Sequence, residues 1–192
     1  MLRSLKAIFS PNTLSLLRIL LIPVFVLIYV FSDTHQWIAG LLFAIASITD
    51  LLDGYIARRT GKTSRFGTFL DPTADKLTVI SALVLLVGMH GRLWLTLPGL
   101  VIVCRELLVS SLREWMAERQ VRSQVAVTNI SKAKTVVQML AIIMLLSNPL
   151  AISPWTILGY VMIYVATALT LWSMFMHLRS AWPVLRSDFI DK

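Results

Sequence analysis

The chain has 192 residues, of which 57% are apolar and only 15% are charged, and its mean hydropathy is +0.76. These values exclude an ordinary soluble globular protein and an intrinsically disordered one, and the single cysteine excludes a disulfide-stabilised scaffold. The 18 basic residues exceed the 10 acidic ones by eight, which suggests either nucleic-acid binding or basic membrane loops that face anionic lipid.

At the start of the chain, basic residues are spaced among apolar ones over residues 1–10, which is typical of a short amphipathic helix on a membrane surface. A cleaved signal peptide is the alternative, but Pro11, Asn12 and Arg18 interrupt any apolar core that such a peptide needs. Apolar stretches of about 20 residues follow, and each is long enough to cross a bilayer. We expect spans at residues 12–32, 36–57, 72–90, 93–112, 125–147 and 154–177.

These elements predict an all-α, polytopic membrane protein with six transmembrane helices, a short N-terminal surface helix and one domain over residues 1–192. The predicted loops at 33–35, 90–92 and 148–153 carry a single basic residue between them, whereas the N-terminus, the tail and residues 58–71 and 113–124 are rich in arginine and lysine. Both termini are therefore expected on the cytoplasmic side. Nucleic-acid binding is disfavoured, because its basic residues would lie beside hydrocarbon.

Four of the ten acidic residues cluster where the second span ends and the third begins: Asp50, Asp53, Asp71 and Asp75. Each carboxylate would cost about 2.5–3.5 kcal/mol at the centre of a membrane and less near its surface. The i,i+3 and i,i+4 spacings place each pair on one helix face, and antiparallel neighbouring helices would let the two faces meet near the cytoplasmic surface. Converging carboxylates repel one another unless a cation lies between them, and oxygen ligands select Mg²⁺ or Mn²⁺.

Small and basic residues accompany this cluster. Gly54 and Ala57 leave room beside the acidic face, and Arg58 can clamp phosphate oxygens. A divalent cation, a guanidinium and small residues together suit the binding of a pyrophosphate. The alternative is that the carboxylates form structural ion pairs with Arg58, Arg59 and Lys76, but the regular spacing and the interleaved small residues favour the metal site.

The segment also fits a family motif, D-x2-D-G-x2-A-R-x8-G-x3-D-x3-D, at every fixed position, and the chain is therefore similar to the CDP-alcohol phosphotransferases. The fixed positions are Asp50, Asp53, Gly54, Ala57, Arg58, Gly67, Asp71 and Asp75. Most of the chain resembles the bacterial members that make phosphatidylglycerophosphate, with supporting segments at residues 11–18, 63–76, 105–106, 112–118 and 132–135.

The resemblance implies that CDP-diacylglycerol and sn-glycerol 3-phosphate react to give phosphatidylglycerophosphate and CMP, the first committed step of phosphatidylglycerol and cardiolipin synthesis. It further implies a homodimer in the bacterial inner membrane, two bound Mg²⁺ or Mn²⁺ ions, and Asp75 as the general base. The implied metal ligands are Asp50, Asp53, Asp71 and Asp75. The implied contacts to the CDP moiety are Gly54, Ala57, Arg58, Ser64 and Gly67, with Asn12 and Ser15 as weaker candidates.

An acceptor phosphate needs cations. Arg105 lies inside an apolar run, where it is costly unless it faces a polar cavity, and Arg113 lies eight residues later, close to the same face. Lys132, Lys134 and Thr135 begin the fifth span on the cytoplasmic side. We expect these five residues to bind glycerol 3-phosphate. The alternative is that Arg105 pairs structurally with a neighbouring glutamate, Glu106 or Glu114, and that the lysines only mark the cytoplasmic side.

Other functions and roles stay open at this point. Serine, inositol phosphate or phosphatidylglycerol could replace the acceptor, and a small cation-coupled transporter would instead require carboxylates nearer mid-span and inverted repeats, which the sequence lacks. Arg18 could extend to the membrane surface or reach a phosphate. Cys104 is expected to be a small buried apolar residue, and the three histidines are too scattered for a metal site.

Overall fold

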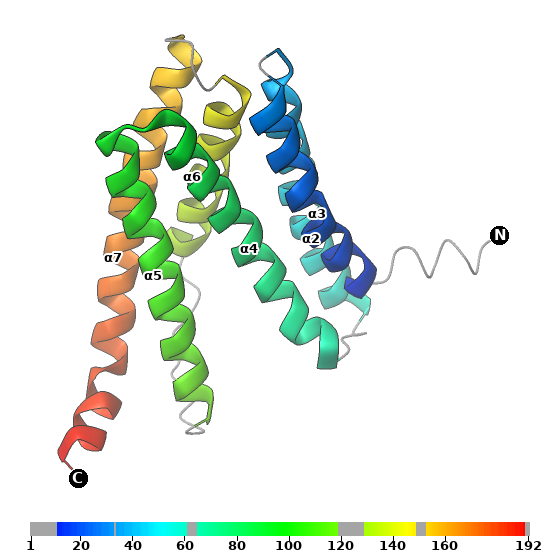
Figure 1. Cartoon of the computed structure of the whole chain (residues 1–192). Helices are drawn as coiled ribbons and strands as arrows, with labels where there is room; N and C mark the ends of the chain where they lie inside the picture. The colour runs from blue at the N-terminus through cyan, green and yellow to red at the C-terminus, as the bar shows by residue number, and fades with distance from the viewer. Residues whose placement is uncertain (1–10, 33, 61–64, 119–128, 149–152, 191–192) are drawn as a thin grey trace.

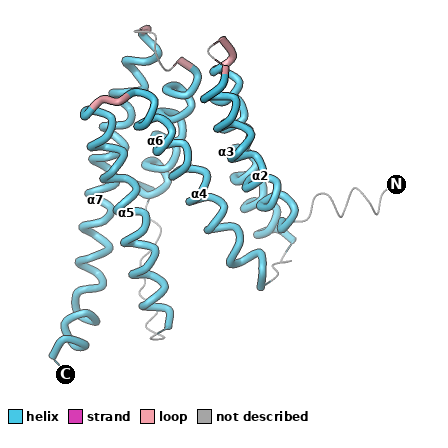
Figure 2. Tube along the Cα trace, viewed as in Figure 1, coloured by secondary structure: helices cyan, strands magenta, loops and turns pink. Residues whose placement is uncertain are grey.

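The computed structural model describes residues 11–32, 34–60, 65–118, 129–148 and 153–190. Within these ranges every regular element is an α-helix, which confirms the all-α prediction (Figure 1, Figure 2). The helices are α2 (Pro11–Phe31), α3 (Gln36–Thr60), α4 (Arg65–His90), α5 (Leu93–Glu118), α6 (Asn129–Ser147) and α7 (Pro154–Ile190). The predicted surface helix at 1–10 lies outside the described residues.

The predicted spans coincide with the helices, but several helices are longer than the spans. α2 and α3 begin within one residue of the predicted positions, whereas α4 begins seven residues earlier than its predicted span and α7 continues to Ile190. A hydropathy pattern identifies only the part of a helix that is apolar enough for the membrane interior. The helix itself can continue through polar residues, because its backbone hydrogen bonds do not depend on the hydropathy of the side chains. Residues 125–128 of the fifth predicted span lie outside the described residues.

Four of the described helices contain a segment long and apolar enough to cross a membrane, by length and composition. These segments are Thr13–Phe31, Phe69–His90, Leu93–Ala117 and Pro154–Trp182. The described parts of α3 and α6 contain the shorter apolar segments Gln36–Asp50 and Ala133–Ser147. The outer surface carries many exposed large apolar side chains, such as Leu20 and Trp172, as expected beside lipid.

The turns use residues suited to them. Gly91 follows α4 with a φ of 56°, and its amide donates to the carbonyl of Val87 at 3.1 Å, so it terminates the helix in the left-handed conformation that glycine adopts without a steric penalty. At the start of α7, Ser153 Oγ accepts a hydrogen bond from the amide of Thr156 at 3.2 Å, and Pro154 occupies the first helical position.

The helices alternate in direction, so α2, α4 and α6 begin on the side of the bundle where α3, α5 and α7 end (Figure 1). α2 packs against both α3 and α4, while α6 packs against α3 and α7, and α5 packs against α4 and α7. The buried core includes Phe25, Tyr29, Phe43, Leu83 and Leu145. This arrangement places the motif at the junction of α2, α3 and α4, and the predicted acceptor residues on α5 and α6 towards the same side.

Candidate active site

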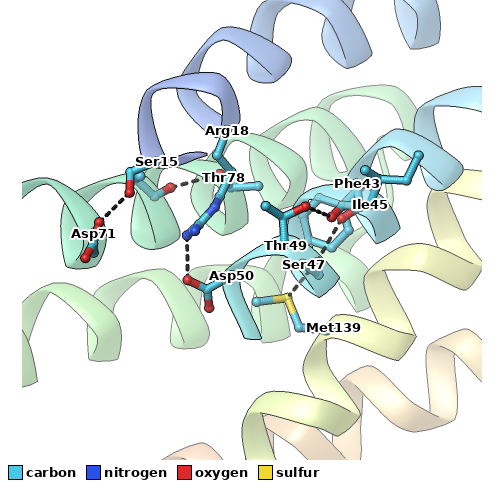
Figure 3. A network of polar contacts seen from close by, with 11 residues as sticks. Ser15, Arg18, Phe43, Ile45, Ser47, Thr49, Asp50, Asp71, Thr78 and Met139 are labelled. Carbon is cyan, nitrogen blue, oxygen red and sulfur yellow. Dashed lines mark hydrogen bonds and ion pairs between the residues drawn. The ribbon is translucent and has the colours of Figure 1, made fainter. Parts of the chain in front are cut away.

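Two buried residues of α2 hold carboxylates of the two halves of the motif (Figure 3). Arg18 Nη1 donates to Asp50 Oδ1 of α3 at 2.6 Å, and Ser15 Oγ donates to Asp71 Oδ1 of α4. Ser15 and Arg18 are three residues apart, so they lie on one face of α2. In the described residues α3 and α4 both pack against α2, which brings Asp50 and Asp71 to its surface.

Asp75 lies one turn after Asp71 on α4 and is partly buried. It interacts electrostatically with Asp50 and Arg18 and also with Glu106 of α5. Lys76, which follows it, donates a hydrogen bond to Ser110 Oγ of α5. Asp75 therefore lies near both Asp50 of the motif and Glu106 of α5.

The remaining motif residues are described only in part. Asp53, Gly54, Ala57 and Arg58 lie in the last turns of α3, but their side chains fall outside the described residues, as do Ser64 and the side chain of Asn12. Gly67 is buried near the start of α4. In the described part of the chain, no group of three or more His, Cys, Asp or Glu residues is arranged as a metal site. The four-carboxylate metal site thus stays a prediction.

A second polar cluster joins α5, α6 and α7. Arg105, which is 6% exposed, donates from Nη1 to Glu106 Oε2 at 2.6 Å and from Nη2 to Ser173 Oγ of α7 at 3.0 Å. Lys134 of α6 is 4% exposed, and its Nζ lies 3.5 Å from the same Glu106 oxygen. Two cations therefore share one carboxylate, which leaves a net positive charge of one in a buried setting. The pairing of Arg105 with Glu106 confirms the contact that the structural alternative predicted.

Arg113 extends this cluster towards the helix ends. Arg113 is an exposed residue, and its Nη2 lies 2.8 Å from Nε2 of His177, a buried residue of α7. The other ring nitrogen of His177, Nδ1, lies 2.6 Å from the carbonyl oxygen of Ser173. Since a carbonyl only accepts, Nδ1 carries the proton and donates, and Nε2 accepts from Arg113. Arg105 and Arg113 thus face the same helix, α7, as their spacing predicted.

The sequence analysis did not predict that Glu106 bridges two cations, it considered His177 only as a metal ligand, and it did not single out Ser173. The only available signal was that Ser173 and His177 are four residues apart in the last span and so share one face. Of the other predicted acceptor residues, Thr135 is exposed on α6 and the side chain of Lys132 lies outside the described residues.

The prediction for Cys104 was wrong. It is exposed, although it lies in an apolar helix. Successive residues of a helix point about 100° apart, so while Arg105 faces α7 and Glu106 faces Lys134, Cys104 is turned to the outer surface of α5.

A family model described as CDP-alcohol phosphatidyltransferase matches residues 8–172. Relatives named CDP-diacylglycerol–glycerol-3-phosphate 3-phosphatidyltransferase include one from Pseudomonas fluorescens, 51% identical over 93% of this chain and 92% of the relative. Another, from Escherichia coli strain K12, is 44% identical over 95% of this chain and 97% of the relative. The phosphatidylinositol phosphate synthase of Mycobacterium tuberculosis, solved in its apo form, has a TM-score of 0.68 and 16% identity, covers 93% and 92% of the two chains, and supports the fold alone.

Proposed function

We propose that this chain, which belongs to the CDP-alcohol phosphatidyltransferase family, transfers the phosphatidyl group of CDP-diacylglycerol to sn-glycerol 3-phosphate, with CMP as the leaving group. The observation that carries the proposal is the identity of 51% and 44%, over more than nine-tenths of both chains, to relatives whose name states this reaction. The product is phosphatidylglycerophosphate, the first committed intermediate on the way to phosphatidylglycerol and cardiolipin.

CDP-diacylglycerol, the donor of the phosphatidyl group, is assigned to the motif. The acidic residues of the motif offer only oxygen ligands, which suit a hard divalent cation. The proposed metal is Mg²⁺ or Mn²⁺, and the resemblance to the family implies two ions. Their ligands would be Asp50, Asp53, Asp71 and Asp75. When bound, the ions neutralise the pyrophosphate and make CMP a better leaving group. The contacts of Asp50 with Arg18 and of Asp71 with Ser15 support the site, because they hold two of these carboxylates on one face of α2.

The CDP moiety is assigned to the small and basic residues of the motif. The residues are Gly54, Ala57, Arg58, Ser64 and Gly67. Small residues allow the nucleotide to approach the helix backbone, and a guanidinium can donate two parallel hydrogen bonds to phosphate oxygens.

Asp75 is the general base of the proposed reaction. It takes the proton from the attacking hydroxyl of glycerol 3-phosphate while that oxygen bonds to the phosphatidyl phosphorus, and the bond from this phosphorus to CMP breaks. Its position supports this role, since it interacts with Asp50 and Arg18 near the proposed site of CDP-diacylglycerol and with Glu106 near the proposed site of the acceptor.

The acceptor phosphate is assigned to the second polar cluster. Arg105, Arg113 and Lys134 supply cations from α5 and α6, and Lys132 and Thr135 belong to the same proposed site. Glu106 offsets one of the charges of Arg105 and Lys134, and Arg113 adds another positive charge. The net positive charge suits a dianionic acceptor better than serine, which carries no phosphate.

The proposed setting is the bacterial inner membrane, with both termini and the active site facing the cytoplasm and with two copies forming a homodimer. The concentration of basic residues in the termini and in residues 58–71 and 113–124 supports this orientation. It also places the site where soluble glycerol 3-phosphate and the nucleotide of CDP-diacylglycerol are accessible.

The test is a product assay with purified protein, labelled CDP-diacylglycerol and separate acceptors: glycerol 3-phosphate, serine, inositol phosphate and phosphatidylglycerol. We expect CMP release and a labelled phosphatidylglycerophosphate with glycerol 3-phosphate alone. A labelled product with one of the other acceptors, and none with glycerol 3-phosphate, would contradict the assignment.

A further inference from the structure

We infer that Ser173 and His177 of α7 are positioning residues that orient the guanidinium groups of Arg105 and Arg113 towards the acceptor phosphate. This inference rests on the proposed function, because it assigns a task to residues beside the proposed acceptor site. Neither residue belongs to the motif, and both lie on the helix that packs against α5.

The contacts pair each arginine with one residue of α7. Arg105 Nη2 donates to Ser173 Oγ at 3.0 Å, and Arg113 Nη2 donates to His177 Nε2 at 2.8 Å. Arginine has a long side chain with about 2 kcal/mol of rotamer entropy. A guanidinium that is already hydrogen-bonded through one nitrogen loses less of that freedom when a phosphate binds, so its contribution to acceptor affinity is larger.

The backbone of α7 fixes the form of the histidine. His177 Nδ1 donates to the carbonyl oxygen of Ser173 at 2.6 Å, so the lone pair of Nε2 points at Arg113. Ser173 thus contributes its hydroxyl to Arg105 and its carbonyl to His177, and one turn of α7 holds both arginines. His177 is 6% exposed, so its ring is largely shielded from bulk water.

Arg105 retains a donor for a ligand. Its two terminal nitrogens bind Glu106 and Ser173, whereas its Nε is buried and has no hydrogen-bond partner among the described residues. A buried donor without a partner is costly, and an anionic acceptor at this position would relieve the cost. The guanidinium is therefore fixed by protein contacts and still has its Nε–H to offer.

Three variants of His177 separate positioning from space filling. His177→Leu removes both ring contacts, His177→Asn keeps a donor near the Nδ1 position alone, and His177→Gln keeps an acceptor near the Nε2 position. We expect His177→Leu and His177→Asn to raise the KM for glycerol 3-phosphate about tenfold, with the KM for CDP-diacylglycerol within about twofold of the parent value. His177→Gln should restore most of the lost affinity. His35→Leu, which changes an exposed histidine at the opposite end of the bundle, is the matched control and should alter neither KM.

A double-mutant cycle identifies the residue through which His177 acts. In an Arg113→Ala background, His177→Leu should add little to the increase in the KM for glycerol 3-phosphate. Additive effects of the two substitutions, equal effects on both substrates, or a KM that is unchanged in His177→Leu would each overturn the inference. The thermal midpoint of every variant shows whether it is folded. If a His177 variant does not fold, Ser173→Ala takes its place and tests the contact with Arg105.

A failure of the proposed function would give a different experimental result from a failure of this inference. If the unsubstituted protein releases CMP with inositol phosphate instead of glycerol 3-phosphate, the proposed function fails, and the same variants are assayed with that phosphorylated acceptor. An increase in its KM that follows the same order of variants would uphold the positioning role. An absence of any effect there would overturn it.

Discussion

Arg18 of α2 and Asp50 of α3 form an ion pair, with Arg18 Nη1 2.6 Å from Asp50 Oδ1 and the arginine side chain only 2% exposed. One turn earlier on the same face of α2, Ser15 donates to Asp71 of α4. α2 therefore aligns carboxylates from the two helices that carry the motif, although it contributes none of the motif's fixed residues (Figure 3).

The first prediction concerns this ion pair. Arg18→Leu should destabilise the protein by about 1–3 kcal/mol, less than the loss of a partner from a fully buried pair, because Asp50 is one-third exposed and its charge is partly hydrated. The measurement is the thermal midpoint in detergent. The matched control is Arg179→Leu, at an exposed position of α7, and equal midpoints for the two variants would show that the pair does not stabilise the fold.

Asp75→Asn tests the general base. The amide cannot accept the proton of the acceptor hydroxyl, so CMP release should fall by a factor of about 10²–10⁴, the typical contribution of general-base catalysis. Metal-dependent binding of CDP-diacylglycerol should be largely preserved. Glu114→Gln, at an exposed position of α5, is the control. Turnover near the parent rate in Asp75→Asn would remove this residue as the base.

Removal of divalent cations tests the proposed metal site. EDTA should abolish CMP release, and either Mg²⁺ or Mn²⁺ in excess should restore it, because oxygen ligands accept both ions. The measurement is the initial rate against the concentration of free metal. Full activity in EDTA, in protein shown by elemental analysis to be free of metal, would refute the proposed role of the carboxylates.

Lys134 tests the acceptor site. Lys134→Ala removes a buried cation, and we expect the KM for glycerol 3-phosphate to rise about tenfold or more, while the KM for CDP-diacylglycerol changes little. Lys134→Arg keeps the charge and should recover part of the affinity. If Lys134→Ala raises both KM values equally, the cluster of Lys134, Arg105 and Glu106 stabilises the fold without binding the acceptor.

Gly40 tests the packing of α3 against α6. A Cβ atom there would lie 2.1 Å from Ser147 Oγ and 3.1 Å from the carbonyl oxygen of Ile143, so the Ser147 hydroxyl would have to turn away and the backbone of α6 would have to shift slightly. Gly40→Ala should therefore lower stability by about 1–3 kcal/mol, the usual cost of overpacking. Gly88→Ala is the control, since a Cβ there meets nothing within 4 Å and alanine favours the helix. A thermal midpoint that falls equally in both variants would contradict this account.

The fold could be predicted in large part because the membrane restricts the choices. A long apolar segment has no water with which to pair its backbone groups, so it must be helical, and the all-α prediction followed from composition. The helix ends were less predictable, since α4 and α7 continue into polar sequence where hydropathy carries no information. The exposure of Cys104 was missed because an apolar residue of a membrane protein can face lipid as readily as the core.

The sequence by itself determined the chemistry: carboxylates at helical spacing, small residues and an arginine beside them, and basic residues at the start of the fifth span. These features lie in short segments, where spacing along one helix decides which side chains share a face. The tertiary structure decided which side chains of other helices contact these carboxylates and arginines. That Arg18 and Ser15 meet Asp50 and Asp71, and that Ser173 and His177 meet Arg105 and Arg113, depends on the packing and rotation of separate helices. Helices far apart in the chain can pack on any face that buries area, and only the assembled bundle selects one.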